Sequence, residues 1–145
     1  MNELEKEMLA TSFFDISEGC FKQGSPWSKK QYHSFFDQSH HHYLVKKHHD
    51  TIIGFLLLSV CFEDAEIELI GVSNEHQRDG VGHSLLKEGL ALLRDKNVTG
   101  LLLEVRESNK KAQFFYDKMG FKEIGRRKKY YHKPQEDALI WHLDL

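Results

Sequence analysis

The sequence predicts one mixed α/β domain that contains a parallel crossover. The chain has 145 residues, the length of an ordinary single domain. Its content of 40% hydrophobic and 29% charged residues is close to that of globular proteins. A strand, a helix and a second strand follow one another between residues 65 and 106, as parallel neighbours require. We therefore expect residues 1–145 to form a single domain with mixed layers.

The first elements are two helices. Residues 3–23 have a helical pattern, and residues 24–26, Gly-Ser-Pro, end it. Its apolar side chains fall roughly on one face: Leu4, Met8, Phe13, Ile16 and Cys20. Ser28 is expected to cap a short helix that carries the aromatic residues Tyr32, Phe35 and Phe36.

Strands follow in the middle of the chain. Residues 43–47 and 51–62 are expected to form a hairpin around a polar turn, and residues 65–72 a third strand. Residues 82–96 have a helical pattern, and residues 101–106 form the next strand. The helix has a single apolar stripe: Leu85, Leu86, Leu90 and Leu93.

The last part of the chain predicts a helix and two strands. Ser108 or Asn109 caps the helix, and Gly120 stands where a glycine ends it. Residues 121–127 and 137–143 are then expected to complete the sheet.

Charge and apolar content argue against a nucleic-acid or membrane partner. Net charge is -2, from 20 basic and 22 acidic residues. The longest apolar run, residues 52–62, is too short to span a bilayer, and the N-terminus has no signal-peptide pattern, so we expect a cytoplasmic protein. Cys20 and Cys61 form no CxxC motif, so both are expected to be buried free thiols.

Two polar clusters are expected to be plain surface. The histidines at 40–42 and 48–49 predict an exposed loop and no metal site, because nothing fixes three or four ligands. Residues 126–129, Arg-Arg-Lys-Lys, predict a solvated strand end rather than a site for RNA or a CoA phosphate.

A glycine-containing loop, residues 77–82, lies between a strand and a helix. Glycines let a backbone approach a ligand, and a helix N-terminus attracts phosphate. Leu85 excludes the third glycine of the dinucleotide fingerprint, and no Gly-Lys-Ser/Thr follows for a P-loop. From these residues alone, a phosphate site and a simple tight turn are about equally favoured.

Longer motifs resemble one enzyme family. The string from Ile70 to Leu86, with Gln77-Arg78-Asp79-Gly80-Val81-Gly82, is similar to the acetyl-CoA motif of GNAT acetyltransferases. The second half resembles the bacterial ribosomal-protein alanine N-acetyltransferases, the RimI type, in these segments: residues 103–109, Ala112, Phe115-Tyr116, Met119-Gly120-Phe121, Arg126-Arg127, Tyr130-Tyr131 and Glu136-Asp137-Ala138. Pro26-Trp27-Ser28 also fits. The resemblance implies a central, mostly antiparallel twisted sheet with helices on both faces.

The resemblance also implies acetyl-CoA as co-substrate and no metal. The pantetheine arm would lie along residues 70–72, with the Val72 N–H stabilising the oxyanion. The cofactor-binding residues it implies are Ile70, Gly71, Val72, Gln77, Arg78, Asp79, Gly80, Val81, Gly82, His83, Asn109 and Tyr116.

Two side chains are candidates for the chemistry. Glu104 interrupts an apolar strand, and from the residues alone an ion pair with Arg106 on the same strand face explains it best. The resemblance favours instead a general base that acts directly or through water. Tyr116 is the candidate general acid, since a phenol can protonate a thiolate. From spacing alone Tyr116 would be an ordinary core aromatic, and the resemblance favours the catalytic role.

The expected acceptor is a protein N-terminus, that of a ribosomal protein beginning with Ala. Candidate acceptor-binding residues are Trp27, Glu68, Tyr130 and Tyr131, with Glu68 standing where the family pattern predicts an apolar residue. One alternative is acetylation of a small amine such as a polyamine, an amino acid or a drug. Another is a CoA-binding regulatory domain without turnover. A monomer or weak dimer is expected.

Overall fold

The computed structural model describes all residues, 1–145, as one six-stranded sheet with four α-helices. In chain order the elements are α1 (Glu3–Cys20), α2 (Lys29–Phe35), β1 (His41–His48), β2 (Thr51–Cys61), β3 (Asp64–Val72), the 3-10 turn η1 (Asn74–His76), α3 (Val81–Asp95), β4 (Gly100–Arg106), α4 (Lys110–Lys118), β5 (Lys122–His132) and β6 (Gln135–Asp144).

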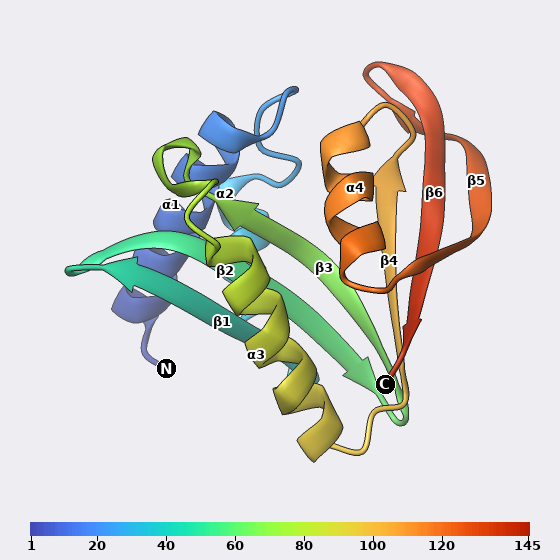
Figure 1. The fold of residues 1–145 in the computed structure, drawn as a ribbon. Helices are drawn as coiled ribbons and strands as arrows, with labels where there is room; N and C mark the ends of the chain where they lie inside the picture. Colours follow the sequence, from blue (N-terminus) through green and yellow to red (C-terminus); the bar gives the residue numbers. More distant parts are fainter.

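The sheet has the order β1-β2-β3-β4-β6-β5, and only β3 and β4 are parallel. This confirms the predicted crossover and the mostly antiparallel sheet. The parallel pairing is short, since it joins Asp64–Glu66 only to Gly100–Leu102. Beyond those residues the two strands diverge toward their C-terminal ends (Figure 1), and we call this gap in the backbone pairing the opening.

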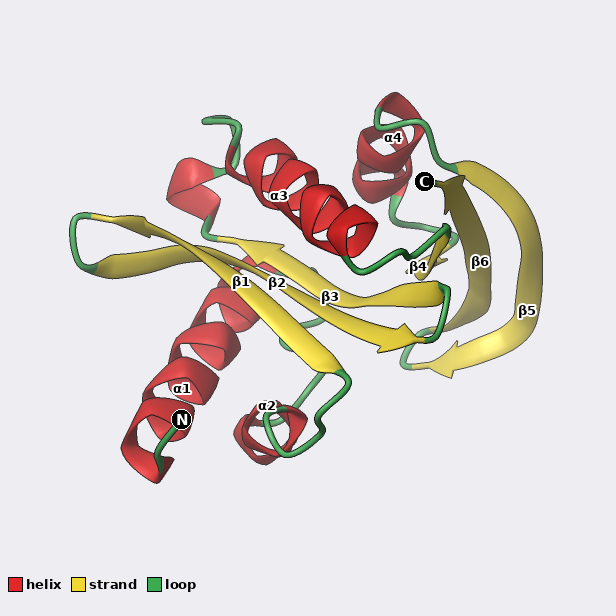
Figure 2. Ribbon diagram, turned by 90° about the horizontal axis from the view of Figure 1, so that it is seen from below, coloured by secondary structure: helices red, strands yellow, loops and turns green.

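Helices cover both faces of the sheet, as Figure 2 shows. On one face α3 and α4 pack on the larger apolar core, and the predicted stripe of α3 is entirely buried. On the other face α1 and α2 pack on a smaller core that includes Phe13, Tyr32 and Phe55. Strand β2 lies between the two cores, so six consecutive residues from Ile53 to Leu58 are buried.

Local sequence explains where the helices begin and end. The Ser28 hydroxyl accepts from the Gln31 N–H while the Gln31 side chain accepts from the Ser28 N–H, a complete capping box for α2. Asn109, rather than Ser108, caps α4 through the Ala112 N–H. Gly120 follows α4 with a φ of +98°, a conformation that favours glycine.

The buried face of α1 differs from the predicted one. Leu4 and Met8 are 66% and 62% exposed, because with 3.6 residues per turn they lie on the side of α1 opposite its buried residues. The buried positions are Ala10, Phe13 and Ser17, and the Ser17 hydroxyl shares a 2.6 Å hydrogen bond with Tyr32.

No helix is both long and apolar enough to cross a membrane.

Three surface predictions were wrong in part. His41 and His42 lie in β1 and not in a loop, and the His41 ring stacks on Phe35 with centroids 4.3 Å apart. The thiol of Cys61 is exposed rather than buried, at the end of β2. Residues 126–129 lie inside β5, which continues to His132, because the hairpin with β6 is longer than the apolar pattern indicates.

Candidate active site

The opening between β3 and β4 exposes a free strand edge. The Ser73 N–H donates to the Ile53 carbonyl of β2 at 2.8 Å. Since backbone groups alternate in direction along a strand, the polar groups of Val72 and Ile70 face the other side, toward β4. Pairing with β4 has already ended at Glu66, so an extended ligand can add to this edge through main-chain hydrogen bonds.

The loop after this edge ends at the N-terminus of α3. Gly80 has a φ of +78° and caps the helix without any side-chain hydrogen bond. The first helical bond, Ser84 N–H to the Gly80 carbonyl, leaves the amides of residues 81–83 unpaired. A Cβ on Gly80 would meet nothing within 4 Å, and Arg78 and Asp79 are exposed. Unpaired amides at a helix N-terminus are suited to a phosphate group.

Gln77 shapes this loop from within. Its amide nitrogen donates to the Val72 carbonyl at 3.2 Å and to Asn74 at 3.1 Å. Its amide oxygen accepts from Lys111 in the first turn of α4, so the loop and α4 are tied across the opening. Lys111 could not be singled out from sequence spacing, because this contact joins residues 34 positions apart.

Glu104 points away from the larger core. Its neighbours Leu103 and Val105 are buried in that core, so Glu104 lies on the face that carries α1 and α2. It pairs with Arg127 of β5 at 3.2 Å, and 19% of its side chain is exposed. The alternative pair with Arg106 is not formed, since Arg106 pairs with Glu136 at 3.0 Å.

Two further carboxylates lie near Glu104 on the same face. Burial raises the pKa of Glu66, and the charges of Glu68 and Glu104 raise it further, with Arg127 acting in the opposite direction. Glu68 accepts a 2.7 Å hydrogen bond from the Ser59 hydroxyl. This face of the opening therefore presents concentrated negative charge, which suits a cationic amine.

Tyr116 lies on the opposite face of the sheet from Glu104. It lies on α4, is 6% exposed, and packs against Phe115 and Phe121. Burial raises the pKa of its phenol, so the hydroxyl stays protonated and able to donate at any physiological pH. The Phe115 ring and the Val72 side chain both lie near Gly82, which places α4 beside the phosphate loop.

Cys20, at the end of α1, lies close to the same strand edge. Burial raises the pKa of its thiol, and a backbone hydrogen bond with Val72 opposes that shift. A protonated thiol is a poor nucleophile. The geometry therefore favours direct attack by the amine over an acetyl-cysteine route.

The four candidate acceptor residues fall into two groups. Tyr131 lies close to Glu104, with the Arg106 guanidinium 4.1 Å above its ring, and Tyr130 is stacked under Arg127 at 5.2 Å. Burial raises the pKa of Tyr131, and the Glu104 charge adds to the shift. Trp27 lies on the other side, in the α1–α2 connection, and lines a groove together with Glu68.

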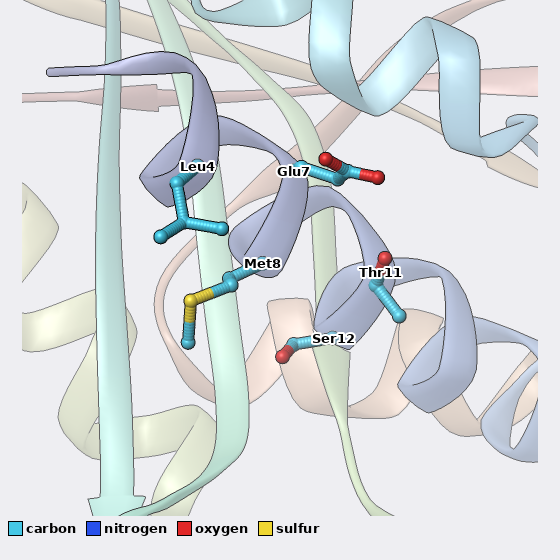
Figure 3. Close-up of a pocket in the computed structure, with 5 residues that line it drawn as sticks. All are labelled: Leu4, Glu7, Met8, Thr11 and Ser12. Carbon is cyan, nitrogen blue, oxygen red and sulfur yellow. The ribbon is translucent and has the colours of Figure 1, made fainter.

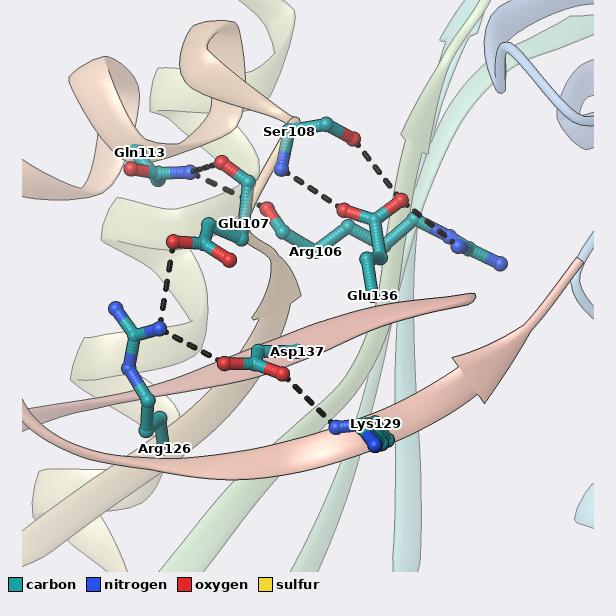
Figure 4. A network of polar contacts seen from close by, with 8 residues as sticks. All are labelled: Arg106, Glu107, Ser108, Gln113, Arg126, Lys129, Glu136 and Asp137. Carbon is teal, nitrogen blue, oxygen red and sulfur yellow. Dashed lines mark hydrogen bonds and ion pairs between the residues drawn. The ribbon is translucent and has the colours of Figure 1, made fainter. Parts of the chain in front are cut away.

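A polar network holds the β5–β6 hairpin to the start of α4 (Figure 4). Glu136 accepts from the Ser108 N–H at 2.9 Å, from the Ser108 hydroxyl at 3.0 Å and from Arg106 at 3.0 Å. Asp137 accepts from Arg126 at 2.8 Å and from the Lys129 N–H at 2.8 Å. The network keeps the hairpin that carries the two tyrosines in a fixed position relative to β4.

Other features of the surface have no part in this site. A hollow of about 470 Å³ runs along α1 beside Leu4, Glu7 and Met8, and it contains none of the predicted site residues (Figure 3). No group of three or more His, Cys, Asp or Glu side chains is arranged to hold a metal ion.

Known proteins share both sequence and fold with this chain. The model of the acetyltransferase (GNAT) family matches residues 10–121. A relative from Salmonella typhimurium (strain LT2), named a ribosomal protein bS18-alanine N-acetyltransferase, is 36% identical over 123 residues, 83% of this chain and 82% of the relative.

Solved structures of acetyltransferases have the same fold as this chain. The crystal structure of the ribosomal-protein-S18-alanine N-acetyltransferase from Escherichia coli has a TM-score of 0.84 at 28% identity and covers 93% of this chain and 86% of its own. A GNAT acetyltransferase from Elizabethkingia anophelis with bound acetyl-CoA has the same fold, with a TM-score of 0.76 at 22% identity, covering 91% of this chain and 90% of its own. The chain therefore belongs to the GNAT family of acetyltransferases, enzymes that transfer the acetyl group of acetyl-CoA to an amine.

Proposed function

We propose that this enzyme acetylates the α-amine of a protein N-terminus, that of a ribosomal protein beginning with Ala. The observation that carries the proposal is the 36% identity, over 83% of the chain, with a relative named for that reaction. The carboxylates beside the opening support it, because an α-amine arrives mostly as a cation at neutral pH.

The residues around the opening fit acetyl-CoA. The edge of β3 around Ile70 and Val72, which is not paired with β4, suits the amides of the pantetheine arm, and the unpaired amides at the start of α3 suit the pyrophosphate. Asn109 uses its side-chain oxygen to cap α4, which leaves its amide nitrogen for the arm. Acetyl-CoA supplies the thioester from which the acetyl group is transferred.

In this mechanism the amine is deprotonated on one face of the sheet, and the thioester is activated on the other. Glu104 lies where the amine enters and takes up its proton, directly or through a water molecule. A modest base suffices, because an α-amine with a pKa of about 8 is partly neutral near pH 7. The Val72 N–H stabilises the negative charge that develops on the carbonyl oxygen, and Tyr116 donates a hydrogen bond to the departing sulfur.

The test is an acetylation assay with defined acceptors. Purified protein, acetyl-CoA and a short peptide beginning Ala-Arg are expected to give thiol release and a gain of one acetyl group on the α-amine, located by fragment masses. The same peptide with a blocked N-terminus is the control and should give neither. Acetylation of polyamines or free amino acids but not of the peptide would overturn the proposed acceptor.

A further inference from the structure

Two side chains cross the opening at the C-terminal end of β3, where backbone pairing with β4 is absent. The Gln77 amide nitrogen donates to the Val72 carbonyl at 3.2 Å, and the Gln77 amide oxygen accepts from the ammonium of Lys111 in α4. We call these two contacts the side-chain bridge. The unpaired part of β3, residues 67–72, is therefore bounded by backbone pairing at one end and by the side-chain bridge at the other.

Both sides of the side-chain bridge are fixed to the rest of the fold. On the loop side, Gln77 also donates to Asn74 at 3.1 Å, and Asn74 donates to the Gly19 carbonyl at the end of α1 at 2.5 Å. On the other side, Gln113 of α4 donates at 3.2 Å to the last carbonyl of β4 and at 2.8 Å to the next one (Figure 4). The single contact between Lys111 and Gln77 is therefore the point at which the side-chain bridge opens most easily.

Lys111 is suited to form and break this contact. Its side chain is exposed, and its ammonium forms no ion pair with a carboxylate. Burial raises the pKa of the Cys20 thiol at the end of α1, and the charge of Lys111 acts in the opposite direction. Since α1 and α4 cover different faces of the sheet, the long side chain of Lys111 spans the opening.

The side-chain bridge lies on the path that we propose for acetyl-CoA. The pyrophosphate would occupy the unpaired amides of residues 81–83, and the thioester carbonyl would reach the Val72 N–H. Gln77 lies between these two sites in the chain and is bonded to Val72 itself. A cofactor arm that joins the two sites therefore has to pass the side-chain bridge on entry and on exit.

We propose that Lys111 closes the opening over the cofactor arm. Its contact with Gln77 breaks while acetyl-CoA enters or CoA leaves, and it forms again once the arm lies on the β3 edge. A contact that is present before and after binding, but absent during passage, raises the barrier in both directions and leaves the dissociation constant almost unchanged. Lys111 is thus a positioning residue that acts through Gln77. The inference shares the placement of the arm with the proposed function and does not depend on the acceptor.

The test is the kinetics of CoA binding to the intact protein, measured by surface plasmon resonance without an acceptor. Lys111→Met keeps most of the side-chain stem and removes the ammonium. It should raise the association and dissociation rate constants together by about three- to fivefold, the size expected of one exposed charged contact. Because both rate constants change in the same direction, the dissociation constant should stay close to that of the wild type.

Lys110→Met is the matched control, because it removes the same charge from the same turn of α4 at an exposed side chain outside the side-chain bridge. Its rate constants should equal those of the wild type. Lys111→Arg keeps both the charge and the hydrogen-bond donors, so it should also retain the wild-type rates. A Tm close to that of the wild type verifies the fold of each variant.

Two results would overturn the inference. Slower association with faster dissociation in Lys111→Met would mean that Lys111 binds a phosphate of CoA directly. Rate constants equal to those of Lys110→Met would mean that the side-chain bridge does not limit exchange. Both results leave the proposed acceptor intact, whereas hydrogen exchange at Ile70 and Val72 that acetyl-CoA does not slow would overturn the placement of the arm itself.

Discussion

Glu104 and Tyr116 lie on opposite faces of the sheet. Glu104 alternates with buried Leu103 and Val105 and so points toward the face of α1 and α2, whereas Tyr116 packs within the core beneath α4. In the proposed mechanism the base therefore meets the amine on one face while the phenol meets the thioester sulfur on the other. This separation lets one side chain accept a proton while the other stays protonated.

Replacing Tyr116 by Phe tests the role of the phenol. We expect kcat to fall between about tenfold and a thousandfold, because one donor to the leaving group is lost while the ring still fills its site. Steady-state kinetics and the dissociation constant for CoA are the measurements. Tyr32→Phe is a matched control, since Tyr32 is also a buried phenol, bonded to Ser17, and should lower the Tm but not kcat. Equal kcat in Tyr116→Phe and the wild type would contradict the role.

Replacing Arg127 by Gln tests whether this residue positions Glu104. The Arg127 Nε lies 3.2 Å from the Glu104 carboxylate, and we expect its loss to lower kcat about tenfold while the KM for acetyl-CoA stays unchanged. Arg126→Gln is the neighbouring control, because Arg126 pairs instead with Glu107 and Asp137. A similar loss of kcat in both variants would mean that the effect is on the hairpin and not on Glu104.

Residue type and family pattern were enough to select Glu104 and Tyr116, but not their partners. Arg106 of β4 and Arg127 of β5 both lie opposite Ala138 of β6, so Arg127 reaches Glu104 across a small residue. That contact depends on the strand order β4-β6-β5, in which the last strand of the chain lies between the other two. Spacing along the sequence cannot reveal such a pair.

The β5–β6 hairpin acts as a unit because its charged residues are tied to the β4–α4 junction. Burial raises the pKa of Glu136, but hydrogen bonds from the Ser108 N–H, the Ser108 hydroxyl and Arg106 outweigh it and hold the pKa below the usual 4.5. Ionised Glu136 therefore stabilises the folded protein above that pH. The stabilisation is lost as the pH falls through the lowered pKa of the folded state.

Replacing Glu136 by Gln should therefore destabilise the protein in a pH-dependent way. We expect a loss of about 1 kcal/mol at pH 7, the low value suited to bonds near solvent, and a Tm lower by about 3 °C. Thermal unfolding between pH 3 and pH 7 is the measurement, with Glu123→Gln on β5, which forms no ion pair, as control. A difference in Tm that stays constant down to pH 3 would contradict the assigned role of the charge.

Elements were predictable where one face meets the core, and less so elsewhere. The α3 stripe follows from helical apolar spacing because it buries one full face, and β2 follows from its continuous apolar run because it lies between the two cores. The burial of α1 was mispredicted because Leu4 and Met8 lie on the side of the helix opposite Phe13 and do not share one face with it. The length of β5 was underestimated because most of its side chains are exposed. Its sequence therefore lacks the alternation of apolar and polar residues that would have indicated pairing with β6.

Across the whole molecule, the opening in the sheet is what joins the fold to the function. Three residue pairs hold β3 to β4, and beyond them the sheet halves are connected through α3, α4 and the contact between Lys111 and Gln77. The sequence predicted the crossover but not this divergence. The apolar patterns of β3 and β4 are those of ordinary strands and do not indicate at which residue their pairing ends. A ligand added to the β3 edge would restore the missing hydrogen bonds.

Acetyl-CoA should therefore stabilise the protein and protect one particular edge. At a free concentration of one hundred times its dissociation constant, the gain is about 2.7 kcal/mol, which corresponds to a rise in Tm of roughly 5–10 °C. Hydrogen exchange of the Ile70 and Val72 amides should slow, since their groups face the opening, while the paired amides of the β1–β2 hairpin should exchange as before. A rise in Tm without slower exchange at Ile70 and Val72 would mean that acetyl-CoA binds away from this edge. The roles assigned to Val72 and Tyr116 would then be wrong together.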